Sequence, residues 1–273
     1  MVLIKLIKKS NKSLTHRWPF GIVPSHTVTT KHTNKQMSTK TLLLTAALSA
    51  AGLATSLAQS NVYSLNVVGY INIPTPTNGL YLVAPAQLDF DGTGVNNTVL
   101  TTFGTGQGGV PYAATTHLYA FDKATGSYVN ALFAAGAWVA GTGLNDVSAK
   151  GLQSGQGVFY ERKTGSPTNL TFVGNVLQGA LVNTPSTGVS LTSSKVPQAG
   201  GLSSVLGLSL PTQASAQNIY RHTSWVDTGT GQYKQSLYLN GSWVGGEPSI
   251  NVGEAFFLNA AAGATWTRNF TVQ

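Results

Sequence analysis

The chain contains no cysteine, which excludes two features that are common among exported proteins. It has no disulfide bonds, and no cysteine that a lipid anchor could modify. A chain of 273 residues is long enough to bury one large core or two smaller ones without covalent cross-links. Ordinary packing must therefore stabilise the fold.

Charged residues are scarce as well, at 9% of the chain, and their distribution is uneven. No acidic residue precedes residue 41, whereas eight lysines and arginines do. From residue 59 onward eight basic residues face eight acidic ones. The formal charge of +8 thus belongs to the N-terminal region, and the body of the chain is neutral. A neutral body has no basic surface for nucleic acid, so we expect no nucleic-acid partner.

The boundary between the two regions has the pattern of a secretory signal. A short charged stretch begins at Met37, an apolar run covers residues 42–57, and small residues at Ser56 and Ala58 suit cleavage after Ala58. The run is too short to favour a transmembrane helix, and no second one follows. We predict a signal peptide over residues 37–58 and a secreted product, periplasmic or extracellular, without a membrane span. We interpret residues 1–36 as a basic extension upstream of the true start; an organelle presequence is the alternative.

The rest of the chain lacks helical periodicity. Short runs of Val, Thr, Tyr, Phe and Trp are interrupted by Gly, Asn, Pro and Ser, which is typical of all-β proteins. Residues 62–73 form a long first strand that we expect to bend at Gly69. Residues 95–103 fit either a short helix or a strand.

One stretch occurs twice, at residues 126–141 and 231–246. Seven of the sixteen paired positions are identical, including Trp138 and Trp243. Residues 155–159 also match 253–257, Phe172 matches Phe270, and 79–84 resembles 188–193 more weakly. The repeat predicts two tandem, homologous, antiparallel β-sandwich-like modules packed together, at residues 59–178 and 179–273.

The repeat also predicts individual hairpins. Asn240-Gly241 is a strong two-residue turn signal between residues 233–239 and Trp243. We expect two further hairpins, one joining residues 158–162 to 169–173 and one joining 256–259 to 266–272. Asp122 and Asp227 are expected to cap turns with their side chains.

Several of these motifs are shared with a known group of proteins. The opening stretch 62–70 (Val-Tyr-Ser-Leu-Asn-Val-Val-Gly-Tyr), the turn at 122–128, and the pairs 155–159 with 170–174 and 196–198 with 268–272 carry the likeness. On these motifs the chain resembles a family of uncharacterised secreted bacterial proteins with a signal peptide and a duplicated β-module. The resemblance implies that architecture and no activity.

Candidate catalytic and metal-binding residues are few. His117 and His222 lack the spacing to other histidines or carboxylates that zinc or a nucleophile would need, so we read both as strand residues. Asp89 and Asp91, followed by Gly92, alternate as in a calcium loop, but a further acidic ligand is missing. A solvated turn is the preferred interpretation. We predict no enzyme activity and no cofactor.

Aromatic residues are the remaining candidates. Trp138 and Trp243 recur at one point of the repeat, so we expect each to fill the core of its module. Trp225 and Trp266 have no aromatic counterpart, so we expect them at the surface, where they could bind a ligand.

Two functions follow from these observations. The first is a non-catalytic secreted or cell-envelope protein, structural or interacting, that contacts itself or other envelope proteins by strand addition through its long first strand. The alternative is a carbohydrate-binding module that uses Trp225 and Trp266 on a polysaccharide. An enzyme is the least favoured reading.

Overall fold

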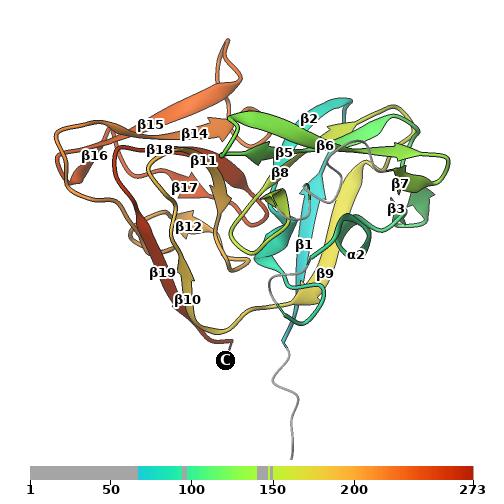
Figure 1. The fold of residues 1–273 in the computed structure, drawn as a ribbon, viewed down its shortest axis with the longest axis horizontal. Helices are drawn as coiled ribbons and strands as arrows, with labels where there is room; N and C mark the ends of the chain where they lie inside the picture. Colours follow the sequence, from blue (N-terminus) through green and yellow to red (C-terminus); the bar gives the residue numbers. More distant parts are fainter. Residues whose placement is uncertain (1–66, 94–96, 140–146, 148–149, 273) are drawn as a thin grey trace, which may run out of the picture. The chain divides into compact units, whose positions relative to one another are not determined.

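The computed structural model describes residues 67–93, 97–139, 147 and 150–272. Residues 64–273 form one compact unit. The fold is all-β, with one group of antiparallel sheets formed by β1–β9 and a second formed by β10–β19, as expected (Figure 1). The predicted extension and signal peptide, and most of residues 140–149, lie outside the described residues.

The first module is built on a five-stranded sheet in the order β2-β8-β5-β6-β7. Its strands are β2 (Gly79–Val83), β5 (Thr116–Asp122), β6 (Ser127–Ala134), β7 (Ala137–Val139) and β8 (Val158–Arg162). A separate ribbon pairs β1 (Val68–Pro74) with β9 (Asn169–Asn175), and a smaller one pairs β3 (Gly106–Gln107) with β4 (Val110–Pro111). The short elements are η1 (Pro85–Gln87) and α2 (Val99–Phe103), so the end of the stretch that fits either a helix or a strand is helical.

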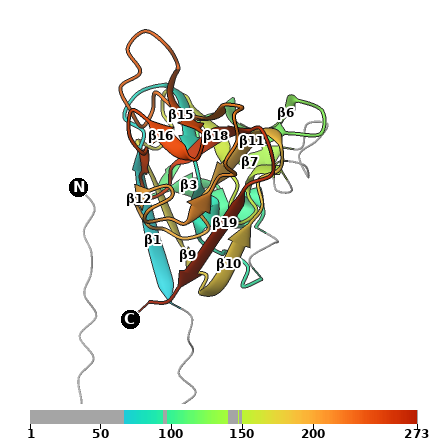
Figure 2. The same cartoon turned by 90° about the vertical axis from the view of Figure 1, so that its left-hand side faces the viewer.

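The second module repeats the plan in the order β11-β18-β14-β15-β16. Its strands are β11 (Gly188–Ser193), β14 (Gln217–His222), β15 (Tyr233–Leu239), β16 (Ser242–Val244) and β18 (Ala255–Ala260). The second sheet joins β10 (Gly179–Asn183), β19 (Thr265–Phe270) and β13 (Leu208–Ser209), and β12 (Gly200–Gly201) pairs with β17 (Ser249–Ile250). Figures 1 and 2 show the ribbon of β1 and β9, and the pair of β10 and β19, extending away from the five-stranded sheets.

Strand register defines which residues of the two modules are equivalent. Phe159 lies opposite both Leu82 and Tyr119 in the first sheet. Phe257 lies opposite both Leu191 and Tyr220 in the second. In the same way Phe121 pairs with Tyr128, and His222 pairs with Tyr233. The sequence repeat therefore corresponds to a repeat of topology and register.

The repeated block forms the β6–β7 and β15–β16 hairpins. The turn residues Asn240 and Gly241 both have positive φ, 50° and 83°, which is the two-residue hairpin turn that the sequence predicts. Ala135 and Gly136 adopt the same conformation in the first module, at 51° and 80°. Trp138 and Trp243 each pack against the core of their own module, but both are only partly buried and lie at its edge rather than filling it.

The two other predicted hairpins are wrong. β9 follows β8 in sequence but pairs with β1, and β19 follows β18 but pairs with β10 and β13. The reason is that both edges of β8 are occupied, by β2 and β5, and both edges of β18 by β11 and β14. The chain after β8 and the chain after β18 must therefore leave their five-stranded sheets, and they form β9 and β19 in other sheets.

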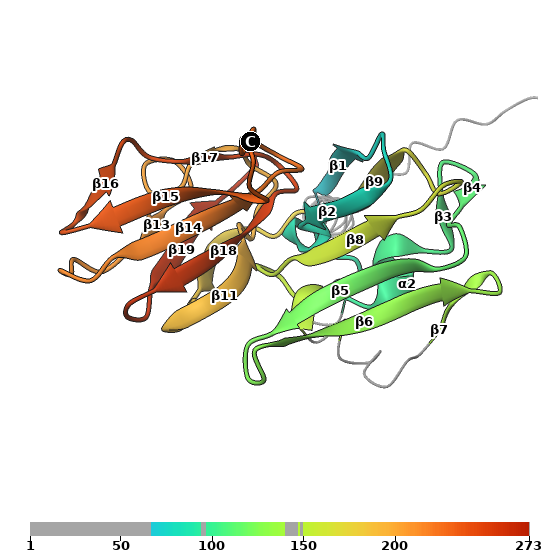
Figure 3. The ribbon, with the colours of Figure 1, turned by 90° about the horizontal axis from the view of Figure 1, so that it is seen from above.

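Alternation along the strands separates a core face from a second apolar face. Leu118 and Ala120 of β5 lie in the core of the first module, whereas Tyr119 and Phe121 pack against a different buried cluster. This cluster takes residues from both modules: Leu82, Ala84, Phe159, Leu191, Ala255 and Phe257. We call it the seam. Figure 3 shows the two five-stranded sheets next to one another.

Candidate functional site

The seam has approximate two-fold symmetry. Ala84 N donates to Gly253 O at 2.7 Å, and the equivalent Ser193 N donates to Gly155 O at 2.9 Å. Phe159 and Phe257, which are equivalent residues, contact each other with ring centroids 6.2 Å apart. At these positions, each contact made by one module is matched by an equivalent contact from the other, as in a two-fold interface.

Aromatic contacts follow the same symmetry. Phe121 meets Phe257 at 5.6 Å between ring centroids, and its equivalent, His222, meets Phe159 at 5.4 Å. Tyr128 meets Phe159 at 6.0 Å, and its equivalent, Tyr233, meets Phe257 at 5.9 Å. The second apolar faces of both sheets thus form one continuous aromatic surface.

Two pockets open on this surface and are related by the same symmetry. The first, about 370 Å³, is lined by Leu80, Tyr119, Tyr128, Phe159, His222, Gln232 and Tyr233. The second, about 260 Å³, is lined by Phe121, Tyr128, Val189, Tyr220, Tyr233 and Phe257. Tyr128 and Tyr233 line both pockets, so together the pockets form one groove, which we call the aromatic groove.

The aromatic groove has an apolar floor and polar edges. Phe159 and Phe257 are only 5% and 8% exposed, whereas Tyr128 is 47% exposed. Burial raises the pKa of Tyr128 and of Tyr233, so both hydroxyls keep their protons at neutral pH and can donate hydrogen bonds. Apart from His222 and the tyrosines, no residue lining the two pockets has an ionisable side chain.

A charged cluster borders one end of the groove. Tyr119 Oη donates to Glu161 Oε2 at 2.9 Å. Burial is the main reason that the pKa of Tyr119 is raised to about 12, and the hydrogen bond to Glu161 adds to it. His117 Nδ1 lies 3.3 Å from Glu161 Oε2, and Lys163 pairs with the other carboxylate oxygen. Burial opposes ionisation of Glu161, but hydrogen bonds from Lys163 and Tyr119 outweigh it and lower its pKa. Glu161 is therefore an acceptor at neutral pH.

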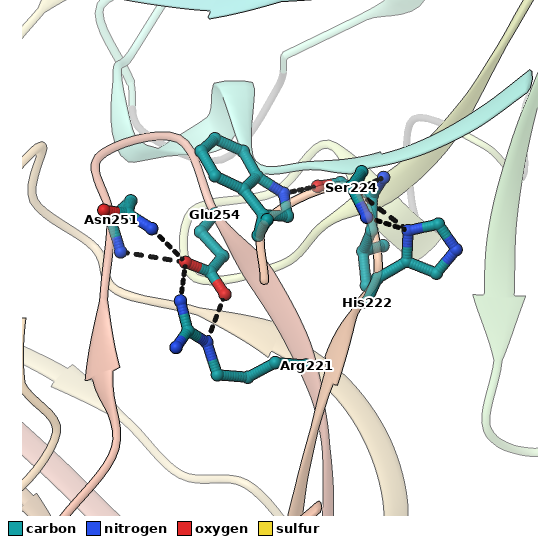
Figure 4. Close-up of polar contacts among 7 residues, drawn as sticks. Arg221, His222, Ser224, Asn251 and Glu254 are labelled. Carbon is teal, nitrogen blue, oxygen red and sulfur yellow. Dashed lines mark hydrogen bonds and ion pairs between the residues drawn. The ribbon is translucent and has the colours of Figure 1, made fainter. Parts of the chain in front are cut away.

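His222 and Ser224 contact each other at the end of β14. His222 Nδ1 lies 2.9 Å from Ser224 Oγ and also accepts the Ser224 backbone N–H at 3.2 Å (Figure 4). The Ser224 hydroxyl in turn accepts the backbone N–H of Leu82 at 3.3 Å. Among the described residues no carboxylate bonds to the imidazole, so the third group that orients a catalytic base is missing there. This contact closes a turn against the first module.

Glu254 is a fully buried carboxylate near the seam, and its side-chain bonds are all to residues of the second module. Arg221 donates Nε to Oε1 at 2.6 Å and Nη2 to Oε2 at 2.7 Å (Figure 4). Asn251 donates both its backbone N–H and its Nδ2 to Oε2 at 2.9 Å. The carboxylate is 0% exposed, so its role is to hold the β17–β18 turn rather than to meet a ligand.

Asp89 and Asp91 form a turn. Asp89 is 4% exposed, and its Oδ1 accepts the backbone N–H groups of Asp91 and Gly92, each at 3.2 Å. Asp91 Oδ1 accepts the N–H of Thr93 at 2.9 Å. No group of three metal-ligating side chains occurs in the described residues. Asp122 and Asp227 likewise accept the N–H groups of Ala124 and Gly229, as predicted.

The surface positions predicted for Trp225 and Trp266 need correction. Trp266 is 3% exposed, and its indole N–H donates to Leu206 O at 2.6 Å, so it is a core residue of the second module. Trp225 is partly buried against the core of the first module and donates to Leu82 O at 2.5 Å. Trp225 joins the modules, and neither tryptophan lines the aromatic groove.

Sequence patterns alone do not single out the tyrosines of the groove. Tyr128 and Tyr233 occupy the same place in both repeats, and recurrence at one point of a repeat is typical of structural residues. Strand alternation was the available signal, since Tyr119 and Phe121 lie on the face opposite to Leu118 and Ala120.

Comparisons with protein-family models, with curated proteins and with solved structures find no match to this chain. In the described part of the chain, no helix is both long and apolar enough to cross a membrane.

Proposed function

We propose that this chain is a non-catalytic secreted or cell-envelope interaction protein, and that the aromatic groove is its binding surface. The observation that carries the proposal is the pair of symmetry-related pockets, which share Tyr128 and Tyr233 and need both modules for their walls. Ligand pockets are typically apolar with a few polar groups at defined places, and this groove has that composition.

The ligand that this composition favours is a neutral carbohydrate. A sugar ring offers C–H faces to aromatic rings and hydroxyl groups to the edge, and tyrosine presents an apolar ring with a polar tip. Glu161, which accepts a hydrogen bond from Tyr119 Oη at 2.9 Å, supplies a further hydrogen-bonding group beside the first pocket. The neutral body of the chain suits an uncharged ligand. This transfers the carbohydrate hypothesis from Trp225 and Trp266 to the tyrosines.

A purely structural role by strand addition has less support. The described part of the first strand, β1, is paired along its whole length with β9 of its own module. To enter a neighbour's sheet, β1 would have to give up this pairing, and otherwise only its second edge could accept a strand.

Binding to polysaccharides tests the proposal. Full-length protein would be passed over immobilised cellulose, chitin, β-1,3-glucan, xylan and mannan. We expect retention on at least one of them, and loss of retention in Tyr128→Ala/Tyr233→Ala. The matched control is Tyr70→Ala, which removes a tyrosine that is 61% exposed on β1, outside the groove. Failure to bind any of the five, or equal retention of the double variant, would refute the carbohydrate assignment.

A further inference from the structure

The two five-stranded sheets end in equivalent edge strands, β2 and β11. Each of these strands is paired on one side only, with β8 and β18 respectively. Leu82 of β2 and Leu191 of β11 are equivalent, because they lie opposite Phe159 and Phe257. Backbone N–H and C=O groups that point outward from such an edge need other partners when they are buried.

The outward groups of Leu82 have partners. Ser224 Oγ accepts the Leu82 N–H at 3.3 Å, and Trp225 Nε1 donates to the Leu82 carbonyl at 2.5 Å. The unrepeated Trp225 therefore caps the β2 edge.

The corresponding cap is missing at Leu191. Counted along the chain from the equivalent residues His222 and Phe121, Lys123 and Ala124 take the places of Ser224 and Trp225, in a turn that is shorter than the one after His222. Lys123 Nζ bonds instead to Ser186 O at 3.0 Å and Thr187 O at 2.5 Å, and Ala124 has no donor in its side chain.

The backbone N–H and C=O groups of Leu191 nevertheless point away from β18, and the residue is buried. Two residues further on, the N–H of Ser193 donates away from β18 to Gly155 O, and antiparallel strands repeat this direction every second residue. Leu191 is 8% exposed. Within the described residues, no group outside β18 bonds to its backbone.

A cavity of about 570 Å³ runs along this edge. Ser190, Leu191 and Thr192 form one wall, and the turn from Phe121 to Ala124 forms part of the other. Two further lining atoms, Ser190 Oγ and Gln156 Oε1, are buried and have no hydrogen-bond partner. The cavity thus contains an open strand edge and unsatisfied side-chain oxygens.

We propose that the β11 edge binds an extended peptide segment of another protein, which adds to the second sheet as a further strand. Strand addition satisfies alternating backbone donors and acceptors, which is what the Leu191 edge offers. A glycan does not supply that alternation. The cavity adjoins the aromatic groove at Phe121, which lines both, but this proposal rests on the backbone groups of the β11 edge rather than on the aromatic sheet face.

A cap transplant tests this site. Random seven-residue peptides displayed on phage would be selected against the full-length protein, and the dissociation constant of an enriched peptide measured by fluorescence anisotropy. Lys123→Ser/Ala124→Trp copies the Ser224–Trp225 cap and should weaken binding at least tenfold, whereas Lys123→Ser alone leaves the edge open. Two versions of the peptide would be compared, one N-methylated at the odd amides and the other at the even ones. Only the version whose methyl groups block the amides that face the β11 edge should lose binding. No enrichment, or equal affinity for the double variant, would overturn the proposal.

Hydrogen exchange gives a second readout that does not depend on the variants. In the wild-type protein the Leu191 amide should exchange at least tenfold more slowly when the selected peptide is bound. An unchanged exchange rate would contradict strand addition at this edge.

Discussion

Glu254 shows how a single buried residue stabilises the β17–β18 turn beside the seam. Its buried carboxylate is balanced by Arg221, whose side chain is 11% exposed. Removal of one partner leaves an uncompensated buried charge, so we expect Arg221→Met to lower the free energy of unfolding by about 3 kcal/mol in urea denaturation. The matched control, Lys163→Met, removes the partner of Glu161 at a more exposed site, where 37% of the lysine side chain is accessible, and should cost less than about 1 kcal/mol. Equal losses would contradict this difference.

His222 makes stability depend on pH. Burial lowers its pKa below the ordinary 6.5, so the unfolded chain binds the proton more readily than the folded protein does. Stability should therefore decrease as the pH falls below about 6.5, with the loss complete below the folded pKa.

His222→Phe isolates this effect, because the equivalent residue of the first module is Phe121. The free energy of unfolding of the variant, measured between pH 7 and pH 5, should fall less steeply than that of the wild type. His117 is present in both proteins and cancels in the comparison. Parallel curves would show that His222 does not titrate differently in the two states.

At the scale of elements, the two repeated hairpins differ in one turn residue. Ala135 adopts φ of 51°, where Asn240 stands in the second module. A residue with a Cβ pays for that conformation, and asparagine tolerates it better than alanine. Ala135→Asn should raise the free energy of unfolding by about 1 kcal/mol. A thermal melt checks this, and a variant no more stable than wild type would contradict it.

Much of the fold could be predicted from local pattern. The strands, the Asn240-Gly241 turn and the packing of Trp138 and Trp243 against their modules all depend on neighbouring residues or on the repeat. Strand partners after Arg162 and after Ala260 could not be predicted, because pairing there depends on which sheet edges are already occupied. The aromatic groove could not be predicted either, because it also depends on contacts between residues distant in sequence. Trp266 is buried by residues distant in sequence, whereas the Tyr128 and Tyr233 faces meet only when two modules associate.

At the scale of the whole molecule, the seam requires close approach of the two modules. A Cβ at Gly157 would lie 2.3 Å from the Cβ of Ala255, and 3.1 Å from Val83 O. Gly157→Ala should therefore separate the modules locally and lower the free energy of unfolding by about 2 kcal/mol. Gly263→Ala is the control, since a Cβ there has no neighbour within 4 Å. If both variants were equally stable, the packing of the seam would be looser than described.

The central claim is that the two modules share one binding groove. The most direct measurement is isothermal titration calorimetry of Tyr128→Ala and of Tyr233→Ala with an oligosaccharide of the polysaccharide that retains the wild-type protein. Each tyrosine lines both pockets, so we predict that either substitution, although made in a different module, weakens binding at least tenfold. Loss of affinity in only one variant, or in neither, would contradict a shared groove.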